Sequence, residues 1–284
     1  MTSNSSLGTV EYRVEDGVAI LTLTRCEADN RITQQMAEAG AAALEAARQD
    51  RSVTGCVLTG EGSVFCTGGD YRRAGGTSIG RLEFARAFND LAQAMVRLGK
   101  PLVAAVNGNA HAGGFSLVAL CDLAVVAEDA TLGLPEAAHG LFPLLALALV
   151  KDCLPQKILF DMVYRARLLD ATEAKSLYLV NDVVPRARVL EAAVALAAST
   201  RNYNPDIISL GRDLYYNMRC ARPHEASEQS RFALAAALKA LEESQPKRLY
   251  SSVSNLADDL GNYAAALCSM ADETRRSHSG PQHA

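Results

Sequence analysis

The sequence predicts an α/β fold followed by a helical C-terminal region. Strand-like and helix-like segments alternate through the first part of the chain, a pattern typical of an α/β core built from right-handed crossovers. From residue 189 onward nearly every segment has a helical pattern. The chain has 284 residues, 49% of them hydrophobic, which is enough for one large domain with a helical appendage.

The first predicted elements are a hairpin, a capped helix and a short strand. Val10–Val14 alternates between polar and apolar residues, Gly17 provides a turn, and Val18–Leu23 continues as a second strand. Thr33 is a candidate N-cap for a helix with apolar residues at helical spacing. Val53–Thr59 is apolar and short, so we expect a buried strand.

The middle of the chain continues the alternation. The expected elements are a helix over Arg81–Leu98, strands over Leu102–Val106, Leu123–Ala127 and Thr131–Leu134, a mostly helical stretch over Leu144–Leu179, and a strand over Val180–Val184. Asn204-Pro205 is a candidate boundary. We therefore expect a core over residues 1–203 and a helical region over residues 204–284.

Composition argues against several classes of partner. The net charge is −4, there is no Trp, and 6% of residues are aromatic, which disfavours a stacking surface for nucleic acid. Basic residues are scattered, so a membrane surface is also unsupported as a partner. The seven cysteines contain no C-x-x-C pair, which disfavours a zinc site and favours reduced thiols in a cytoplasmic protein. The N-terminus lacks the basic and apolar regions of a secretory signal.

Two glycine loops and one carboxylate are the candidates for chemistry. Gly113 and Gly114 precede the apolar helical run Phe115–Ala119, where backbone N–H groups lack intrahelical partners and the helix dipole favours negative charge. A second glycine-rich loop ends the segment Val64–Asp70. Glu136 follows in an apolar setting, which tends to raise the pKa of a carboxyl group and suits it to proton transfer.

Four motifs together resemble the crotonase family, also called the enoyl-CoA hydratase/isomerase family. They are VFCTGGD at Val64–Asp70, KPLVAAVNGNAHAGGFSL at Lys100–Leu117, CDLAVVAEDATLGLPE at Cys121–Glu136, and LLDATEAKSLYLVNDVVP at Leu168–Pro185. The resemblance covers roughly residues 9–190, with the motifs in the family's order and spacing. It implies a spiral of ββα turns, assembled as a homotrimer or a hexamer.

The same resemblance implies a coenzyme A thioester as substrate and no metal or redox cofactor, since coenzyme A enters as part of the substrate. By motif position, the backbone N–H groups of Gly69 and Gly113 would hold the thioester oxygen as an enolate forms. Glycine leaves both N–H groups open to close approach. Each such donor typically contributes about 2.7–4 kcal/mol to lowering the barrier.

One departure from the family pattern decides the expected reaction. Hydratases of the family usually carry two glutamates; the first would fall at Ser116, and the second falls on Glu136. One base suits Δ3-Δ2 double-bond isomerisation of an enoyl-CoA, in which Glu136 moves a proton from C2 to C4. Two alternatives stay open: an atypical enoyl-CoA hydratase, with water held by Glu136 and Ser116 or a histidine, and a non-catalytic acyl-CoA-binding protein.

Other residues are expected to support the site. His139 lies three residues after Glu136 and could stabilise its charge, while His111 precedes the second glycine loop. The bland alternative, a surface or supporting histidine, is the more common role for such residues. Asp70 is expected to fix the first glycine loop as an acceptor. Phe142, Leu144 and Leu145 are expected on the acyl side of the pocket.

Overall fold

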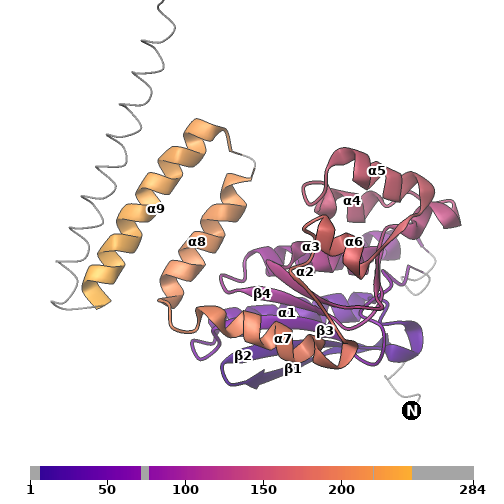
Figure 1. The fold of residues 1–284 in the computed structure, drawn as a ribbon, viewed down its shortest axis with the longest axis horizontal. Helices are drawn as coiled ribbons and strands as arrows, with labels where there is room; N and C mark the ends of the chain where they lie inside the picture. The colour runs from indigo at the N-terminus through magenta and orange to yellow at the C-terminus, as the bar shows by residue number, and fades with distance from the viewer. Residues whose placement is uncertain (1–6, 72–76, 220, 245–284) are drawn as a thin grey trace, which may run out of the picture. The chain divides into compact units, whose positions relative to one another are not determined.

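A computed structural model describes residues 7–71, 77–219 and 221–244. The chain divides into two compact units, Met1–Arg222 and Pro223–Ala284, and α9 represents the second unit (Figure 1). The strands are β1 (Thr9–Glu15), β2 (Val18–Thr24), β3 (Gly55–Gly60), β4 (Leu102–Val106), β5 (Ala110–His111), β6 (Leu123–Ala127), β7 (Thr131–Gly133), β8 (Leu168–Asp170) and β9 (Asp182–Val184). The α-helices are α1 (Gln34–Gln49), α2 (Ser78–Val96), α3 (Gly113–Leu120), α4 (Leu144–Val150), α5 (Gln156–Arg165), α6 (Ala171–Ser176), α7 (Val189–Ala197), α8 (Pro205–Met218) and α9 (Pro223–Ser244).

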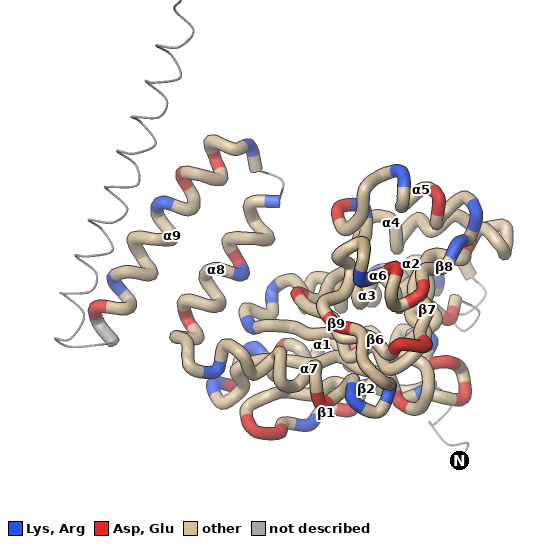
Figure 2. The backbone as a smooth tube through the Cα atoms, viewed as in Figure 1, with Lys and Arg blue, Asp and Glu red and all other residues tan. Residues whose placement is uncertain are grey.

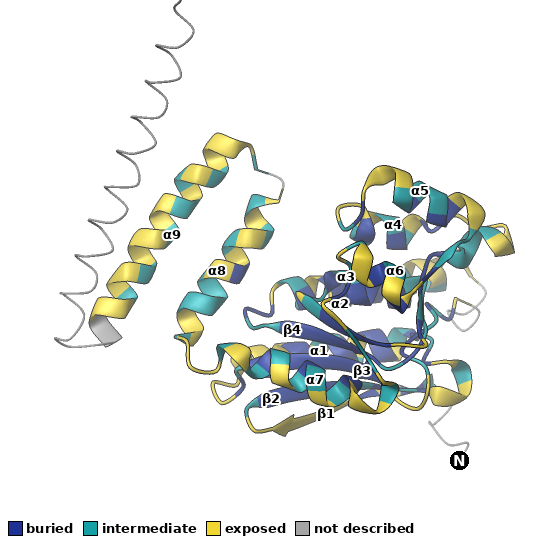
Figure 3. Cartoon of the chain, viewed as in Figure 1, coloured by how far each residue is buried: buried dark blue, intermediate teal, exposed yellow. Residues whose placement is uncertain are grey.

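A six-stranded sheet in the order β1-β2-β3-β4-β6-β9 forms the centre of the first unit. The predicted hairpin is confirmed: β1 and β2 pair antiparallel, with Glu15 opposite Val18 across the turn at Gly17. All the other pairs are parallel. Every residue of β3 and β4 is buried, whereas most of the edge strand β1 is exposed (Figure 3). Continuous apolar runs therefore form the central strands, and an alternating run forms the edge.

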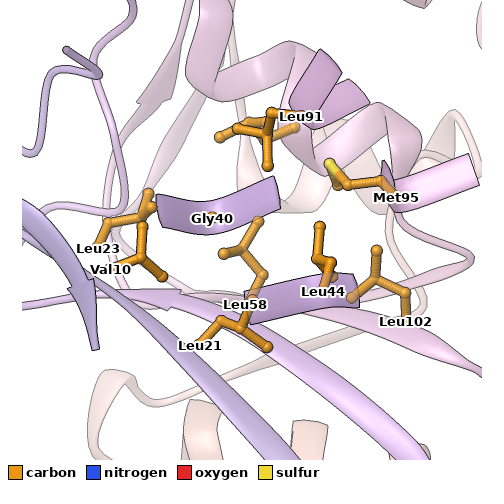
Figure 4. A pocket seen from close by; sticks show the side chains of 10 residues that line it. Val10, Leu21, Leu23, Gly40, Leu44, Leu58, Leu91, Met95 and Leu102 are labelled. Carbon is orange, nitrogen blue, oxygen red and sulfur yellow. The ribbon is translucent and has the colours of Figure 1, made fainter. Parts of the chain in front are cut away.

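Helices cover both faces of this sheet. Thr33 caps α1 as predicted, because its hydroxyl accepts a hydrogen bond from Met36 N at 3.1 Å. Gly40 of α1 lies so close to α2 that an added Cβ would stand 3.0 Å from Leu91 Cδ1. Leucines and a methionine from the sheet and both helices surround this point and leave a small apolar gap (Figure 4). On the opposite face α7 packs against β3, β4 and β6.

The second sheet, in the order β5-β7-β8, contains the main local departure from the sequence prediction. The mostly helical stretch predicted over Leu144–Leu179 includes α4, α5 and α6, but Leu168–Asp170 is strand β8. β8 pairs antiparallel with β7, and β7 pairs parallel with β5. A three-residue strand has no period of its own, so its partner in the fold decides its conformation.

Helix α8 begins at the candidate boundary Asn204-Pro205. Asn204 caps α8 through its side chain, and Pro205 is the first helical residue. However, the first compact unit runs on to Arg222, because Arg212 of α8 is buried against the core. Its guanidinium pairs with Asp122 at 2.9 Å and donates to the carbonyl of Met95 at 2.8 Å. Residues 245–284 of the predicted region lie outside the described residues.

Acidic and basic residues are interspersed along the first unit (Figure 2). In the part of the chain that the structure describes, no helix combines the length and hydropathy needed to cross a membrane. The described cysteines, Cys26, Cys56, Cys66, Cys121 and Cys153, are free thiols.

Candidate active site

The candidate residues lie in loops that follow the carboxyl ends of neighbouring strands. The loop Cys66–Tyr71 comes after β3, and the turn into α3 comes after β4. Glu136 comes after β6 and the short strand β7. Because β3, β4 and β6 are parallel, these loops leave the sheet at one edge. That edge is the usual location of ligand sites in open α/β sheets.

The loop that carries Gly69 is held by backbone hydrogen bonds on both sides. Cys66 N donates to Asn109 O at 3.1 Å, and His111 N donates to Cys66 O at 2.9 Å. Further on, Ile32 N donates to Gly68 O, and Asp70 N donates to Ile32 O, both at 2.8 Å. In a parallel bridge, the residue that lies between two such hydrogen bonds directs its own N–H away from the bridging partner. The Gly69 N–H therefore points away from Ile32.

The loop before α3 adjoins this first loop. Gly113 is the first residue of α3, so its N–H has no acceptor within the helix. A Cβ added at Gly68, whose φ is +112°, would stand 2.9 Å from Ala112 Cβ and 3.5 Å from Gly113 N. At Gly114, a Cβ would stand 2.0 Å from Cys66 O. The two backbones can approach this closely only because glycines occupy the contact.

Ala112 is strained where it introduces α3. Its φ is +51° and its ψ is −122°, a combination that costs a residue with a Cβ of order 1–3 kcal/mol, so about that much strain is stored. The residue is held by the hydrogen bond from its N–H to Gly133 O at 2.8 Å. Strain of this kind often accompanies functional turns, and Ala112 directly precedes the first N–H groups of α3.

Two phenylalanines of α2 form an aromatic wall behind the glycines, a feature that the sequence interpretation missed. A Cβ added at Gly69 would stand 2.7 Å from Phe84 Cζ, and one at Gly113 would stand 3.3 Å from Phe88 Cζ. The two rings have centroids 6.3 Å apart. Their spacing of four residues placed them on one helix face, but sequence carries no signal for what that face contacts.

Glu136 lies in a short 3-10 helix, Pro135–His139, directly after β7. The β7 residue Gly133 pairs with His111, which is two residues before Gly113, so this pairing brings the carboxylate toward the second glycine loop. Burial raises the pKa of Glu136, opposed by its own backbone N–H and by the charge of His139. Among the described atoms, its buried Oε2 has no hydrogen-bond partner. Such a carboxylate suits a base that works near neutral pH.

Tyr71 packs beside the first glycine loop. Its ring packs edge-on against Phe84, with centroids 4.9 Å apart, and its Cε2 would stand 3.2 Å from a Cβ added at Gly69. Burial raises the pKa of the Tyr71 phenol, and the charge on Glu136 raises it further.

The other polar residues named from sequence have structural contacts. Ser116 is fully buried, and its hydroxyl donates to Ala112 O at 3.4 Å. His111 Nε2 bonds Thr131 Oγ1 at 2.8 Å, and burial lowers the pKa of His111, which favours its neutral form. That bond joins β5 to β7 through side chains. His139 is exposed and acts on Glu136 through its charge.

Asp70, at the end of the first glycine loop, forms a buried ion pair. Its Oδ2 lies 2.8 Å from Arg25 Nη2, and both side chains are almost fully buried. Arg25 Nη1 also donates to Arg31 O at 3.0 Å. Arg25 and Asp70 are 45 positions apart, and no sequence pattern indicated that they pair.

The remaining expectations concern the acyl side and metals. Leu144 is 76% exposed and Phe142 is at the surface beside Tyr164, with ring centroids 6.5 Å apart, whereas Leu145 packs against the core. The described residues contain no group of three or more His, Cys, Asp or Glu side chains that could hold a metal ion.

Comparisons with known proteins agree with this architecture. The sequence profile of the family described as enoyl-CoA hydratase/isomerase matches residues 13–244. A Thermus thermophilus protein provisionally named an enoyl-CoA hydratase is 36% identical over 209 residues, which cover 71% of this chain and 82% of that protein. The 2,3-dehydroadipyl-CoA hydratase of Escherichia coli is 34% identical, covering 66% of this chain and 74% of that enzyme. The structure of an enoyl-CoA hydratase from Mycobacterium smegmatis superposes with a TM-score of 0.78 at 28% identity, covering 89% of this chain and 96% of that one. The chain therefore belongs to the enoyl-CoA hydratase/isomerase family, with the crotonase fold, and is an enzyme of that superfamily.

Proposed function

We propose that the protein moves the double bond of a 3-enoyl-CoA into conjugation with the thioester. The observation that supports this reaction is a single glutamate, Glu136, with Ser116 at the position where two-glutamate hydratases carry the other. Burial raises the pKa of Glu136, which suits this carboxylate to proton transfer.

The proposed mechanism needs no water and no redox change. The Glu136 carboxylate takes the proton from C2, and the electron pair of that C–H bond passes toward the thioester carbonyl. The N–H groups of Gly69 and Gly113 hold the resulting enolate oxygen. Glu136, now protonated, returns the proton at C4, and the double bond moves from C3–C4 to C2–C3. Base and substrate recover their original charges.

A hydratase is the second candidate, and the names of the relatives favour it. The Escherichia coli relative is named a hydratase. In this reaction Glu136 would hold and activate a water that adds to a 2-enoyl-CoA, with Ser116 as its second support. The contact of Ser116 with Ala112 O at 3.4 Å is long for a hydroxyl donor, so this hydrogen bond holds the hydroxyl only weakly.

Paired incubations with a 3-enoyl-CoA and a 2-enoyl-CoA separate the two reactions. Conversion of the 3-enoyl substrate to the conjugated thioester without change of mass is the expected result. Addition of one water to the 2-enoyl substrate would replace the isomerase by the hydratase. If neither substrate reacts but thioester binding is retained, the protein catalyses another reaction or is a non-catalytic binding protein.

Two variants assign the base. Glu136→Gln should abolish whichever reaction is seen, and full activity in it would overturn the mechanism. Ser116→Ala should leave an isomerase nearly unchanged, because the hydroxyl contacts only its own helix in the described structure. It should impair a hydratase that uses Ser116 to hold water.

We further propose that the protein assembles as a homotrimer or hexamer and that residues 204–284 contribute to assembly or cover the acyl-CoA site. The family resemblance supports this proposal. Light scattering on the full chain should give three or six times the monomer mass. A monomeric mass across a wide range of concentration would contradict it.

A further inference from the structure

Three polar side chains form a hydrogen-bonded chain beside the second glycine loop. Thr131 Oγ1 lies 3.0 Å from Asn109 Oδ1 and 2.8 Å from His111 Nε2. Thr131 N also donates to Asn109 Oδ1 at 3.0 Å, so the Asn109 atom that faces Thr131 is its carbonyl oxygen, which can only accept. The Thr131 hydroxyl has one proton, and this proton goes to that oxygen. The hydroxyl therefore accepts from His111, whose Nε2 carries the ring proton.

The His111 ring is held in one protonation state and one orientation. Burial lowers the pKa of His111 and favours the neutral ring. A neutral imidazole has a single N–H, and the contact with Thr131 fixes that N–H at Nε2. The ring is thus a fixed hydrogen-bond donor, and the proposed mechanism gives it no proton to move.

His111 lies where three segments of the candidate site meet. Its backbone N–H donates to Cys66 O at 2.9 Å, and Cys66 belongs to the first glycine loop. The chain reaches Gly113 two residues after His111. The His111 side chain binds Thr131, the first residue of β7, and β7 leads to Glu136. One residue therefore contacts, or continues into, every segment that carries a group of the proposed mechanism.

The strands at this junction are very short. β5 has two residues and β7 has three. Their backbone pairs are Ala110 with Leu132 and His111 with Gly133, and the pairing continues only as far as the bond from Ala112 N to Gly133 O. So short a pairing provides few backbone hydrogen bonds. The side-chain bond of His111 is therefore a large part of what sets the placement of β5 against β7.

We propose that His111 is a positioning residue whose Nε2–H, bonded to Thr131, holds the Gly113 N–H and the Glu136 carboxylate in the relative placement that the reaction needs. The inference rests on the proposed function, in which Glu136 is the base and Gly113 holds the thioester oxygen. It applies to an isomerase and to a hydratase, because both place negative charge on that oxygen. In this role His111 exchanges no proton with the substrate.

The test separates the hydrogen bond from the side chains that form it. Thr131→Val keeps the shape of the residue and removes the hydroxyl, whereas Thr131→Ser keeps the hydroxyl. His111→Leu removes the donor, whereas His111→Gln keeps an amide N–H at similar reach. With the substrate that is turned over, kcat should fall at least about tenfold in Thr131→Val and His111→Leu, because a displacement of about 1 Å can cost about 100-fold. KM should change little, and Thr131→Ser and His111→Gln should retain most of the parent kcat.

Thr54→Val is the matched control. The Thr54 hydroxyl donates to Gly17 O at 3.2 Å just before β3 begins, which is the end of that strand opposite to the candidate site. Any fall in melting temperature should be similar in the two valine variants, but kcat should change only in Thr131→Val. The double variant of His111→Leu with Thr131→Val should be no slower than the slower single variant, because both substitutions remove the same bond.

A second readout needs no turnover. Histidine labelled with nitrogen-15 allows the His111 signals to be assigned by their absence in His111→Leu. Above the pKa of the ring, the parent protein should show the proton fixed at Nε2, and Thr131→Val should show a mixture of both tautomers. A parent-like kcat in Thr131→Val and His111→Leu, or a His111 proton on Nδ1, would overturn the positioning role while Glu136→Gln stays inactive. Full activity in Glu136→Gln would instead overturn the proposed function itself.

Discussion

The contact between Gly69 and Phe84 gives the sharpest test of the candidate site. No left-handed φ is recorded for Gly69, so alanine can adopt its backbone conformation, and only space opposes the substitution. Carbon atoms pack best at about 3.5–4.0 Å, whereas the new Cβ would stand 2.7 Å from Phe84 Cζ. The ring or the loop in Gly69→Ala must therefore move by about 0.8–1.3 Å.

The surroundings decide which of the two moves. Phe84 is 1% exposed and is bounded by the rings of Tyr71 and Phe88. The loop is bound to Ile32 on either side of Gly69. Overpacking of this kind costs about 1–3 kcal/mol of unfolding free energy, which corresponds to a fall in melting temperature of roughly 3 °C per kcal/mol for a unit of this size. Any shift of the loop also displaces the Gly69 N–H, and loss of one such donor lowers kcat by about 100- to 1000-fold.

The assay pairs thermal unfolding with kcat for Gly69→Ala, Phe84→Leu and the double variant. Leucine removes the atoms that the new Cβ meets, so the double variant should regain at least about 1 kcal/mol over the sum of the single effects. Gly211→Ala is the matched control, because a Cβ there meets nothing within 4 Å. Additive effects in the double variant, or a stable and fully active Gly69→Ala protein, would refute the argument.

Three further substitutions test the same cluster, and a fourth, Arg165→Met, is a control. Burial raises the pKa of Glu136, so the folded state favours the protonated carboxyl group. The stability that this gives is present below the pKa of the unfolded state and is lost as pH rises through the pKa of the folded state. Glu136→Gln should therefore be inactive yet more stable than the parent at pH 7, with the difference disappearing in acid; chemical denaturation at several pH values checks this. Arg25→Met should lose about 3–5 kcal/mol by leaving the Asp70 carboxylate buried without its cation. Arg165→Met, which removes a 73% exposed arginine, should change stability by less than about 1 kcal/mol. Ala112→Gly should relieve about 1–3 kcal/mol of strain and lose about 0.5–1 kcal/mol through chain entropy, so the free energy of unfolding should not fall. A variant less stable than the parent would contradict the presence of strain at Ala112.

Local patterns in the sequence predicted the elements whose form depends on the segment itself. The continuous apolar runs Leu102–Val106 and Leu123–Ala127 are strands with the predicted bounds. The start of α2 was placed three residues late, at Arg81, because Gly80 weakens the helical pattern there. In the structure Thr77 caps this helix by accepting from Gly80 N at 3.1 Å. Strand β8 was missed because pairing with β7 creates it.

The candidate site divides in the same way. Residue type and order were enough to single out the two glycine loops and Glu136, because each has a local signature. The partners that hold them are distant in sequence and became visible only in the fold. Arg25 holds Asp70, and the rings of Phe84 and Tyr71 stand against Gly69. Contacts of this kind leave no periodic trace in a single sequence.

Several unfavourable features coincide at this one edge of the sheet. Ala112 has a backbone conformation that suits glycine, and Glu136 is a partly buried carboxylate with a raised pKa and an unpartnered oxygen. The central strands, by contrast, are apolar, continuous and buried. Proteins generally depart from local rules of stability where function requires it. Because both departures fall in loops beside the adjoining glycines, they support the proposal that this edge of the sheet holds the active site.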